Sequence, residues 1–383
     1  MSVFAVDDTT VQVTWRDLPP GPVEVLAAGR SGAIEHPGGP GAVRVGGLTP
    51  WRSVDVVVRA GGTVAARQRV RTGAPGLGAE LFRFATVSDL HLGETRFGFF
   101  GTIREQPEPD VPHPVRCLRQ ALRELRAWGA ALVVVKGDLT HVGRRSEWEL
   151  AGAELAASGM PTIALVGNHD ARPARPLRGD ADPDTTVPAA DGLRIAGLGW
   201  PDGADVHVHD APGLRIVLAD TTIEHRHVGT YDRCRTQVAD LAADARRQGR
   251  PVFVAGHHFP MPLPVPHFWP PGVPPSEASR FFATLAAANP AAFYSAGHTH
   301  RHRRYRRHGI PATEVGSPKD YPGTWAGYTV HEGGIRQTVW RVGTPDVLRW
   351  TEHSRRAALG AWGLWSPGRL RDRCFWHRWP ALA

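Results

Sequence analysis

The middle of the chain contains the sequence Ala131-Leu132-Val133-Val134-Val135-Lys136-Gly137-Asp138-Leu139-Thr140. Its continuous apolar run is typical of a strand that is buried on both faces, as in a parallel sheet. Similar strands are predicted before it at residues 81–87 and after it at residues 162–166. The segments between these strands have the signals of helices, so the order strand–helix–strand–helix–strand predicts an α/β domain.

Two helices are predicted between these strands. The first can end at Gly129 and has apolar residues at helical spacing, at Val115, Leu118, Leu122 and Leu125. The second is predicted to begin at a capping box of Ser146 and Glu149 and to end near Gly159. Long irregular stretches, typical of functional loops, cover residues 94–114 and 260–275. Further strands are predicted at residues 193–198, 214–219, 252–255, 292–295, 328–331 and 337–341.

Polar residues that can bind a metal follow these apolar runs. They form five blocks: S-D-L-H at 88–91, K-G-D-L-T at 136–140, G-N-H-D at 167–170, A-G-H-H at 255–258 and G-H-T-H at 297–300. Sites in α/β sheets form beyond the carboxyl ends of parallel strands. Each block alone can be a turn or a strand-end hydrogen bond. Together they predict one shared site, because ionisable residues are rarely buried unless they are paired or bind a metal.

The donors in these blocks are carboxylates, imidazoles and an amide oxygen, without thiolates. Such donors suit divalent Mn, Fe, Zn, Co or Ni. Seven ligands are too many for one tetrahedral ion that keeps an open position, and they suit two ions that share a bridging ligand. Two ions about 3.5–4 Å apart can hold the attacking and leaving oxygens of an in-line displacement.

The blocks D-x-H, G-D, G-N-H-D, a later His and G-H-T-H, in this order, resemble those of the calcineurin-like metallophosphoesterase family. The resemblance covers residues 82–342 and implies a four-layer α/β/β/α sandwich with a dinuclear centre of two divalent metals, most simply Mn, Fe or Zn. It implies that Asp138 bridges the two metals. The other implied ligands are Asp89, His91 and His300 for the first metal, and Asn168, His257 and His298 for the second.

The resemblance also implies a mechanism. A hydroxide that bridges the metals attacks phosphorus in line, and the metals offset the developing charge. His169 acts as general acid or stabilises the phosphoryl oxygens, so His169 and Asp138 are expected to carry catalysis. The fourth block leaves His257 and His258 as alternative ligands. His257 directly follows the strand and is preferred, and His258 then supports it or faces the substrate.

Two positions differ from purple acid phosphatases, which have a tyrosine three residues after the bridging aspartate and D-x-G in the first block. These positions hold His141 and His91 here. The D-x-H and G-N-H-D blocks resemble the cyclic-nucleotide and glycerophosphodiester branch, so a phosphodiesterase is predicted. A phosphomonoesterase or a nuclease of the same fold is the alternative. A non-catalytic binding module is disfavoured because none of the expected ligands is missing.

The first segment, residues 1–75, has a different pattern. Its runs at residues 11–15 and 54–58 alternate with period two between Gly- and Pro-rich turns, which predicts a small all-β sandwich before the catalytic domain. Trp15 and the sequence Gly47-Leu48-Thr49-Pro50 resemble a fibronectin type III module, although Val54 stands where that family usually has a tyrosine. A linker is predicted at residues 73–78. The sequence does not predict a partner for the sandwich.

The catalytic domain is expected at residues 80–343, and a Trp- and Arg-rich extension follows at residues 344–383. Packing of these tryptophans over the catalytic domain is favoured over contact with nucleic acid or a membrane. The basic run at residues 301–308 fits a solvated strand and turn as well as an anion-binding surface. Arginines that can meet a phosphate are Arg172, Arg175 and Arg178. Aromatic residues that either wall the cleft or pack between the domains are Phe97, Phe99, Phe100, Phe268 and Trp269.

The composition of the 383 residues, 42% hydrophobic and 21% charged, is typical of a soluble protein with two or three domains. No apolar run reaches the roughly 18 residues of a transmembrane helix, and no secretory leader is expected. Three cysteines without a C-x-x-C pair predict reduced thiols in the cytoplasm. The net charge of +8 allows an anionic partner. A phosphate ester is the expected substrate, and nucleic acid is a second candidate that is not favoured.

Overall fold

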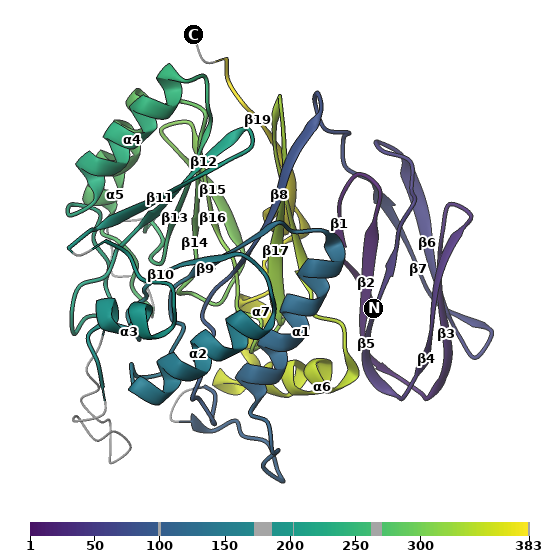
Figure 1. The fold of residues 1–383 in the computed structure, drawn as a ribbon. Coiled ribbons are helices and arrows are strands. Elements are labelled where there is room, and N and C mark those ends of the chain that lie inside the picture. The colour runs from purple at the N-terminus through teal and green to yellow at the C-terminus, as the bar shows by residue number, and fades with distance from the viewer. Residues whose placement is uncertain (99–100, 172–185, 202, 262–269, 382–383) are drawn as a thin grey trace.

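The structure, a computed structural model, describes residues 1–98, 101–171, 186–201, 203–261 and 270–381. An all-β sandwich comes first in the chain and packs beside a larger α/β domain (Figure 1). One sheet of the sandwich has the order β1-β2-β5, with strands at Ser2–Val6, Val11–Leu18 and Gly39–Val45. The other has the order β4-β3-β6-β7, with strands at Arg30–His36, Gly21–Ala27, Ser53–Ala60 and Thr63–Arg71.

The core of the sandwich is built around Trp15. The indole is buried, and its Nε1 donates to Nε2 of His36 at 3.3 Å. Gly41 lies against the ring, where an added Cβ would come within 2.2 Å of it, so only glycine fits at this crossing. The predicted all-β region is therefore present. The finer resemblance to a fibronectin type III module stays a prediction.

Two six-stranded sheets form the α/β domain. The first has the order β10-β9-β8-β17-β18-β19, with strands at Thr162–Leu165, Leu132–Lys136, Glu80–Val87, Thr324–His331, Gly334–Arg341 and Cys374–Arg378. The second has the order β11-β12-β13-β14-β16-β15, with strands at Val206–Ala211, Leu214–Ala219, Val252–Gly256, Ala292–Ala296, Ile310–Glu314 and Arg303–Arg307. Strands β8, β9 and β10 are parallel to one another, as are β12, β13, β14 and β16.

The two sheets pack face to face and helices cover their outer faces (Figure 1). Phe84 of β8 lies between the sheets, with ring centroids 4.9 Å from Phe253 of β13 and 4.8 Å from Tyr328 of β17. The helices that cover the first sheet are α1 (His113–Trp128), α2 (Arg145–Ala157) and α6 (Pro345–Ser354); those on the second are α4 (Arg235–Arg247) and α5 (Pro275–Ala288). This arrangement confirms the predicted four-layer α/β/β/α sandwich.

Two local predictions are wrong. Residues 193–198, expected to form a strand, contain the end of helix α3 (Ala189–Ile195), which packs Gly192 closely against the ring of Trp148. A short apolar run does not distinguish a strand from a buried helix turn. Helix α2 begins before the expected capping box of Ser146 and Glu149. The carboxylate of Glu147 accepts from the backbone N–H groups of Val142 (2.9 Å) and Arg144 (3.3 Å) instead.

The C-terminal extension is part of the catalytic domain's architecture. Besides α6 and β19, it forms a short 3₁₀ helix at Ala358–Gly360, α7 at Trp362–Trp365 and α8 at Leu370–Arg373. Strand β19 pairs antiparallel with β18, and Trp350 is buried in the core beneath α1. Its tryptophans therefore pack against the catalytic domain, as the sequence analysis favoured.

Polar contacts join the sandwich to the rest of the chain. The side-chain amide of Gln12 donates to the carbonyl of Arg341 (2.7 Å) and accepts from its N–H (2.9 Å). Arg44 pairs with Glu124 of α1 at 2.6 Å.

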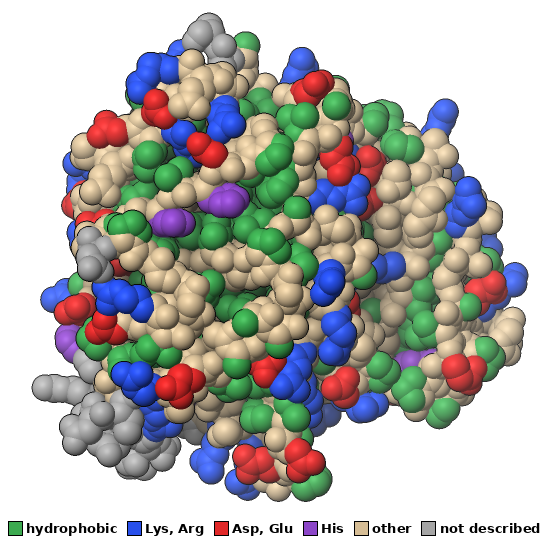
Figure 2. Space-filling model, viewed as in Figure 1, with side chains coloured by type: hydrophobic (Ala, Val, Ile, Leu, Met, Phe, Trp, Pro, Cys, Tyr) green, Lys and Arg blue, Asp and Glu red, His purple; other side chains and the backbone are tan. Residues whose placement is uncertain are grey.

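On the face seen in Figure 2, basic and acidic side chains are interspersed, so the net charge is not gathered into one patch there. No helix in the described ranges is long and apolar enough to cross a bilayer.

Candidate metal centre

The candidate ligands lie on tight turns at the strand ends. The φ angles of Asp89, His91, Asp138, His298 and His300 all lie between 46° and 69°. This left-handed region is strained for residues other than glycine, and such strain persists where the surroundings enforce it, commonly at functional sites. Gly167 shows how closely the turns approach, because an added Cβ there would lie 2.2 Å from Oδ1 of Asp138. The fold thus forces these side chains toward one point.

The first group of ligands surrounds Asp89. Potential ligand atoms of Asp89, His91 and His300 all lie within 4.8 Å of one another. Nε2 of His300 is 3.5 Å from Oδ1 of Asp89, and Nε2 of His91 is 3.5 Å from Oδ2 of Asp138. Asp89 is oriented by the N–H of His298, which donates to its carboxylate at 2.9 Å. The spacing leaves room for one ion among these donors.

The second group shares Asp138 with the first. Nε2 of His257 lies 3.3 Å from Oδ2 of Asp138, 3.1 Å from Oδ1 of Asn168 and 3.2 Å from Nδ1 of His298. Asp89, Asp138 and His257 also form a group within 4.8 Å. Asp138 therefore has donors of both groups on either side, so all seven residues expected from the sequence are brought together.

Three of the candidate histidine ligands have their other ring nitrogen held by an acceptor. Nδ1 of His257 donates to the carbonyl of Lys136 at 2.8 Å, and Nε2 of His298 donates to the carbonyl of Pro271 at 3.0 Å. Nδ1 of His300 donates to Asp320 at 2.6 Å. Each bond leaves the opposite nitrogen, which faces the other candidate ligands, without its proton in the neutral ring. Histidines that bind metals are held in this way, so the residues fit divalent ions.

A buried histidine without hydrogen-bond partners also supports a metal site here. Neither ring nitrogen of His91 has a hydrogen-bond partner among the described residues, and burial, His169 and Lys319 hold its pKa well below the usual range. His91 is thus a neutral imidazole that a metal can satisfy. Burial opposes ionisation of Asp138, but His257 and His169 outweigh it and hold the pKa of this carboxyl well below its usual range.

Asp170 holds the second and third ligand turns together. Its carboxylate accepts from the N–H groups of Leu139 (3.1 Å), Thr140 (2.9 Å) and Gly167 (2.9 Å). Burial, followed by the charge of Asp138, raises the pKa of Asp170 to about 7. Asp170 is the last residue of the G-N-H-D block, and it fixes the turns that present Asp138 and Asn168.

His227 is a neighbour of the site that sequence reasoning missed. Nδ2 of Asn168 lies 3.0 Å from Nδ1 of His227, which orients the amide so that Oδ1 faces His257. Because His227 lies on a loop 59 residues from Asn168 with no motif around it, no sequence signal identifies it.

A buried ion-pair network supports His300 from behind. Nζ of Lys319 lies 2.5 Å from Glu94 and 3.3 Å from Asp320, the acceptor of His300. Nε1 of Trp362, in the C-terminal extension, donates to Asp320 at 3.3 Å. Phe97 packs in this layer, with its ring centroid 4.6 Å from Nζ of Lys319. Phe97 thus belongs to the core behind the centre, and no sequence motif predicted this network.

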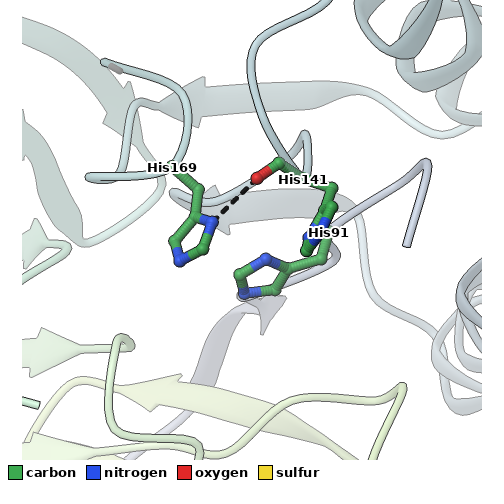
Figure 3. A group of neighbouring side chains, drawn as sticks. All are labelled: His91, His141 and His169. Carbon is green, nitrogen blue, oxygen red and sulfur yellow. Dashed lines mark hydrogen bonds between the residues drawn. The ribbon is translucent and has the colours of Figure 1, made fainter. Parts of the chain in front are cut away.

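His169 lies at the edge of the cluster beside His91 and His141 (Figure 3). Its backbone N–H donates to Oδ1 of Asp138 at 2.8 Å, and its Nδ1 donates to the carbonyl of His141 at 2.8 Å. Because a carbonyl can only accept, Nδ1 keeps its hydrogen, and Nε2 is the nitrogen that can exchange a proton. Burial lowers the pKa of His141 to about 4, so this ring is neutral near pH 7.

His258 differs from His257 in its surroundings. Its Nδ1 lies 2.9 Å from Oγ1 of Thr221, and its ring packs 4.5 Å from the ring of His298. His257 is the one whose nitrogen reaches both Asp138 and Asn168. Other residues expected near the substrate lie outside the described ranges: Arg172, Arg175, Arg178, Phe99, Phe100, Phe268 and Trp269.

Comparison with solved structures gives similar folds at low identity. A purple acid phosphatase, PPD1, from yellow lupin (Lupinus luteus) seeds is 16% identical, with 89% of this chain and 72% of that chain covered and a TM-score of 0.46. PhoD is 12% identical, with coverages of 90% and 87% and a TM-score of 0.45. The phosphopantetheinyl hydrolase PptH from Mycobacterium tuberculosis is 14% identical, with coverages of 63% and 92% and a TM-score of 0.35.

A comparison with curated protein sequences gives no match. The sequence model of the calcineurin-like phosphoesterase family matches residues 82–302, which is more than half of the chain. The matched region contains both ligand groups and the strands from β9 to β14. The chain therefore belongs to the calcineurin-like phosphoesterase family.

Proposed function

We propose that this protein is a dinuclear metal-dependent phosphodiesterase. The observation that carries the proposal is the pair of ligand groups that meet at Asp89 and Asp138, each with potential donors within 4.8 Å. Asp138 would bridge two divalent ions. The remaining ligands would be Asp89, His91 and His300 for one ion, and Asn168, His257 and His298 for the other. Oxygen and imidazole donors of this kind suit Mn, Fe or Zn.

Different residues of the chain would have different roles in hydrolysis. Two bound ions would activate water and offset charge on the phosphoryl oxygens. Asp138 and Asn168 would hold their positions through Asp170, which fixes both turns. Nε2 of His169 would give a proton to the leaving oxygen, since Nδ1 is held by the His141 carbonyl.

The charge around the centre supports a diester over a monoester. A monoester carries two negative charges near neutral pH and needs fixed cations. His91, His141 and His298 all have lowered pKa values and are neutral there. The charge of Lys319 is already matched by Glu94 and Asp320. The pKa values of His257 and His300 are raised, but as metal ligands these rings would give up the extra proton. Among the described residues, the metal-loaded site would therefore offer little positive charge beyond the metals.

Side-by-side kinetics decide between the two substrate classes. A bis-aryl and a mono-aryl phosphate with the same leaving group would be compared in Mn buffer, with Asp138→Asn and a chelator as controls. We expect a higher kcat/KM for the diester. A clear monoester preference would favour a phosphomonoesterase of the same fold, and no hydrolysis of either by metal-loaded protein would favour a non-catalytic binding role.

The cysteines support action in a reducing compartment, for which we propose the cytoplasm. Cys117, Cys234 and Cys374 are free thiols. Burial raises the pKa of Cys234 to about 12 and that of Cys374 to about 11, which keeps both protonated and unreactive.

A further inference from the structure

A cavity of about 610 Å³ lies away from the candidate metal centre. It is lined by Pro290, by the turn between β15 and β16, and by the end of β19. Pro290 comes just before β14, whereas His298 and His300 follow the carboxyl end of that strand. A strand of this length spans about 15 Å. The cavity is therefore at the opposite end of the sheet and is a separate feature of the fold.

The described residues that line this cavity include bases and no acids. Arg306, His308, His377 and Arg378 contribute to its wall. Neither arginine forms an ion pair in the part of the chain that the structure describes, and Arg306 donates only to the backbone carbonyl of Gly309, at 3.0 Å. Unpaired guanidinium groups facing one cavity create a positive potential there.

The charge of Arg306 also acts on neighbouring groups, in addition to burial. Burial lowers the pKa of His377 to about 4, and the charges of Arg306 and Arg304 add to the effect. Burial also lowers the pKa of Arg304. Asp372 opposes this shift, and Arg306 and Arg371 add to it. Several positive charges therefore lie close together around this cavity.

Two residues of this wall, His377 and Trp379, each have a buried nitrogen without a partner. Nε1 of Trp379 and Nε2 of His377 have no hydrogen-bond partner among the described residues, although the two residues are only 8% and 6% exposed. Buried polar groups are normally paired, and an indole N–H can only donate.

We propose that this cavity binds a small, multiply charged oxyanion such as a di- or triphosphate. Guanidinium groups pair with phosphate oxygens in a planar, two-pronged geometry that suits Arg306 and Arg378. The volume is in the range of small-molecule sites, about 300–1,000 Å³. A nucleic acid strand would instead need a basic groove that continues along its backbone. The basic run that ends at His308 would then contribute to binding this oxyanion.

Calorimetric titration of the full chain, with metals removed by a chelator, tests this site without interference from the metal centre. Pyrophosphate, triphosphate and citrate serve as probes, so that phosphate can be distinguished from carboxylate oxyanions. Arg306→Ala and Arg378→Ala are each expected to weaken pyrophosphate binding about 10- to 100-fold, the usual effect of losing a hydrogen bond to a charged group.

Arg303→Ala is the matched control. It removes the same charge from the same strand, but its guanidinium lies 5.8 Å from the ring of Trp365 and does not line the cavity. Pyrophosphate affinity unchanged in Arg303→Ala supports the proposal. An equal loss in all three variants, or no binding of any probe at millimolar concentration, overturns it. Binding of an oligonucleotide but not of pyrophosphate also overturns it, in favour of a nucleic acid surface.

Discussion

His300 and Asp320 form a hydrogen bond of 2.6 Å that connects the metal centre to the C-terminal extension. The second oxygen of Asp320 accepts from Nε1 of Trp362 at 3.3 Å. Trp350, on α6, donates to the carbonyl of Lys319 at 2.5 Å. A carboxylate behind a histidine ligand fixes its ring and raises its basicity. The extension therefore supports a metal ligand as well as completing a sheet.

Asp320→Asn is expected to weaken metal binding at the ion held by His300 by about 10- to 100-fold, because partners of ligating histidines have effects of that size. Titration of chelator-treated protein with Zn, followed by calorimetry, measures the change. Asp346→Asn, at a half-exposed carboxylate on α6, is the control. Unchanged affinity in a folded Asp320→Asn protein would show that the contact does not orient His300.

His169→Ala is expected to keep both metals and to lower kcat by about 10²–10⁴, the usual contribution of acid–base assistance. The loss should shrink for esters with very acidic leaving groups, which depart without a proton. Kinetics on a series of aryl esters, with metal content measured on the same samples, check this. An equal loss across the series would rule out proton donation by His169.

Gly167→Ala is expected to disrupt the centre, because the new Cβ would lie 2.2 Å from Oδ1 of Asp138. Metal content and thermal unfolding would both fall. Gly46→Ala is a suitable control, since its new Cβ would meet only Oγ1 of Thr10, at an ordinary 3.7 Å. Full metal content in Gly167→Ala would mean that the two turns do not approach as closely as the structure has them.

Metal affinity is expected to increase with pH between about 6 and 9. Burial lowers the pKa of His257, but Asp138 outweighs it and raises the pKa to about 9. Asp320 and Asp89 likewise outweigh burial and raise the pKa of His300. His257 therefore carries a second ring proton in metal-free protein at neutral pH, and an incoming metal must displace it; the raised pKa of His300 acts in the same direction. Proton release on adding Zn in weak buffer measures this. Affinity independent of pH would contradict it.

The ligand blocks could be predicted because everything needed for them is local in sequence. An apolar run followed by G-D or G-N-H-D identifies both the strand and the donors at its end, as at Asp138 and Asn168. The topology of parallel sheets then brings such ends together. The four-layer fold followed from the resemblance of these blocks to the calcineurin-like metallophosphoesterase family.

The supporting residues could not be predicted in the same way. Asp320 reaches His300 across 20 residues, and His227 reaches Asn168 across 59, through contacts that exist only in the folded chain. The strand predicted at residues 193–198 is wrong because a short apolar run carries no signal for the packing of α3 on Trp148. No pattern in the sequence around Trp362 predicts its hydrogen bond to Asp320.

The number of metal ions per chain tests the central claim most directly. Elemental analysis of folded protein saturated with Mn or Zn should give two ions per chain. Asp138→Asn should lose affinity for both, since its carboxylate lies between Nε2 of His91 and Nε2 of His257. His91→Ala should weaken mainly one. One ion or none at saturation in the unaltered protein would contradict the dinuclear centre and the mechanism proposed for it.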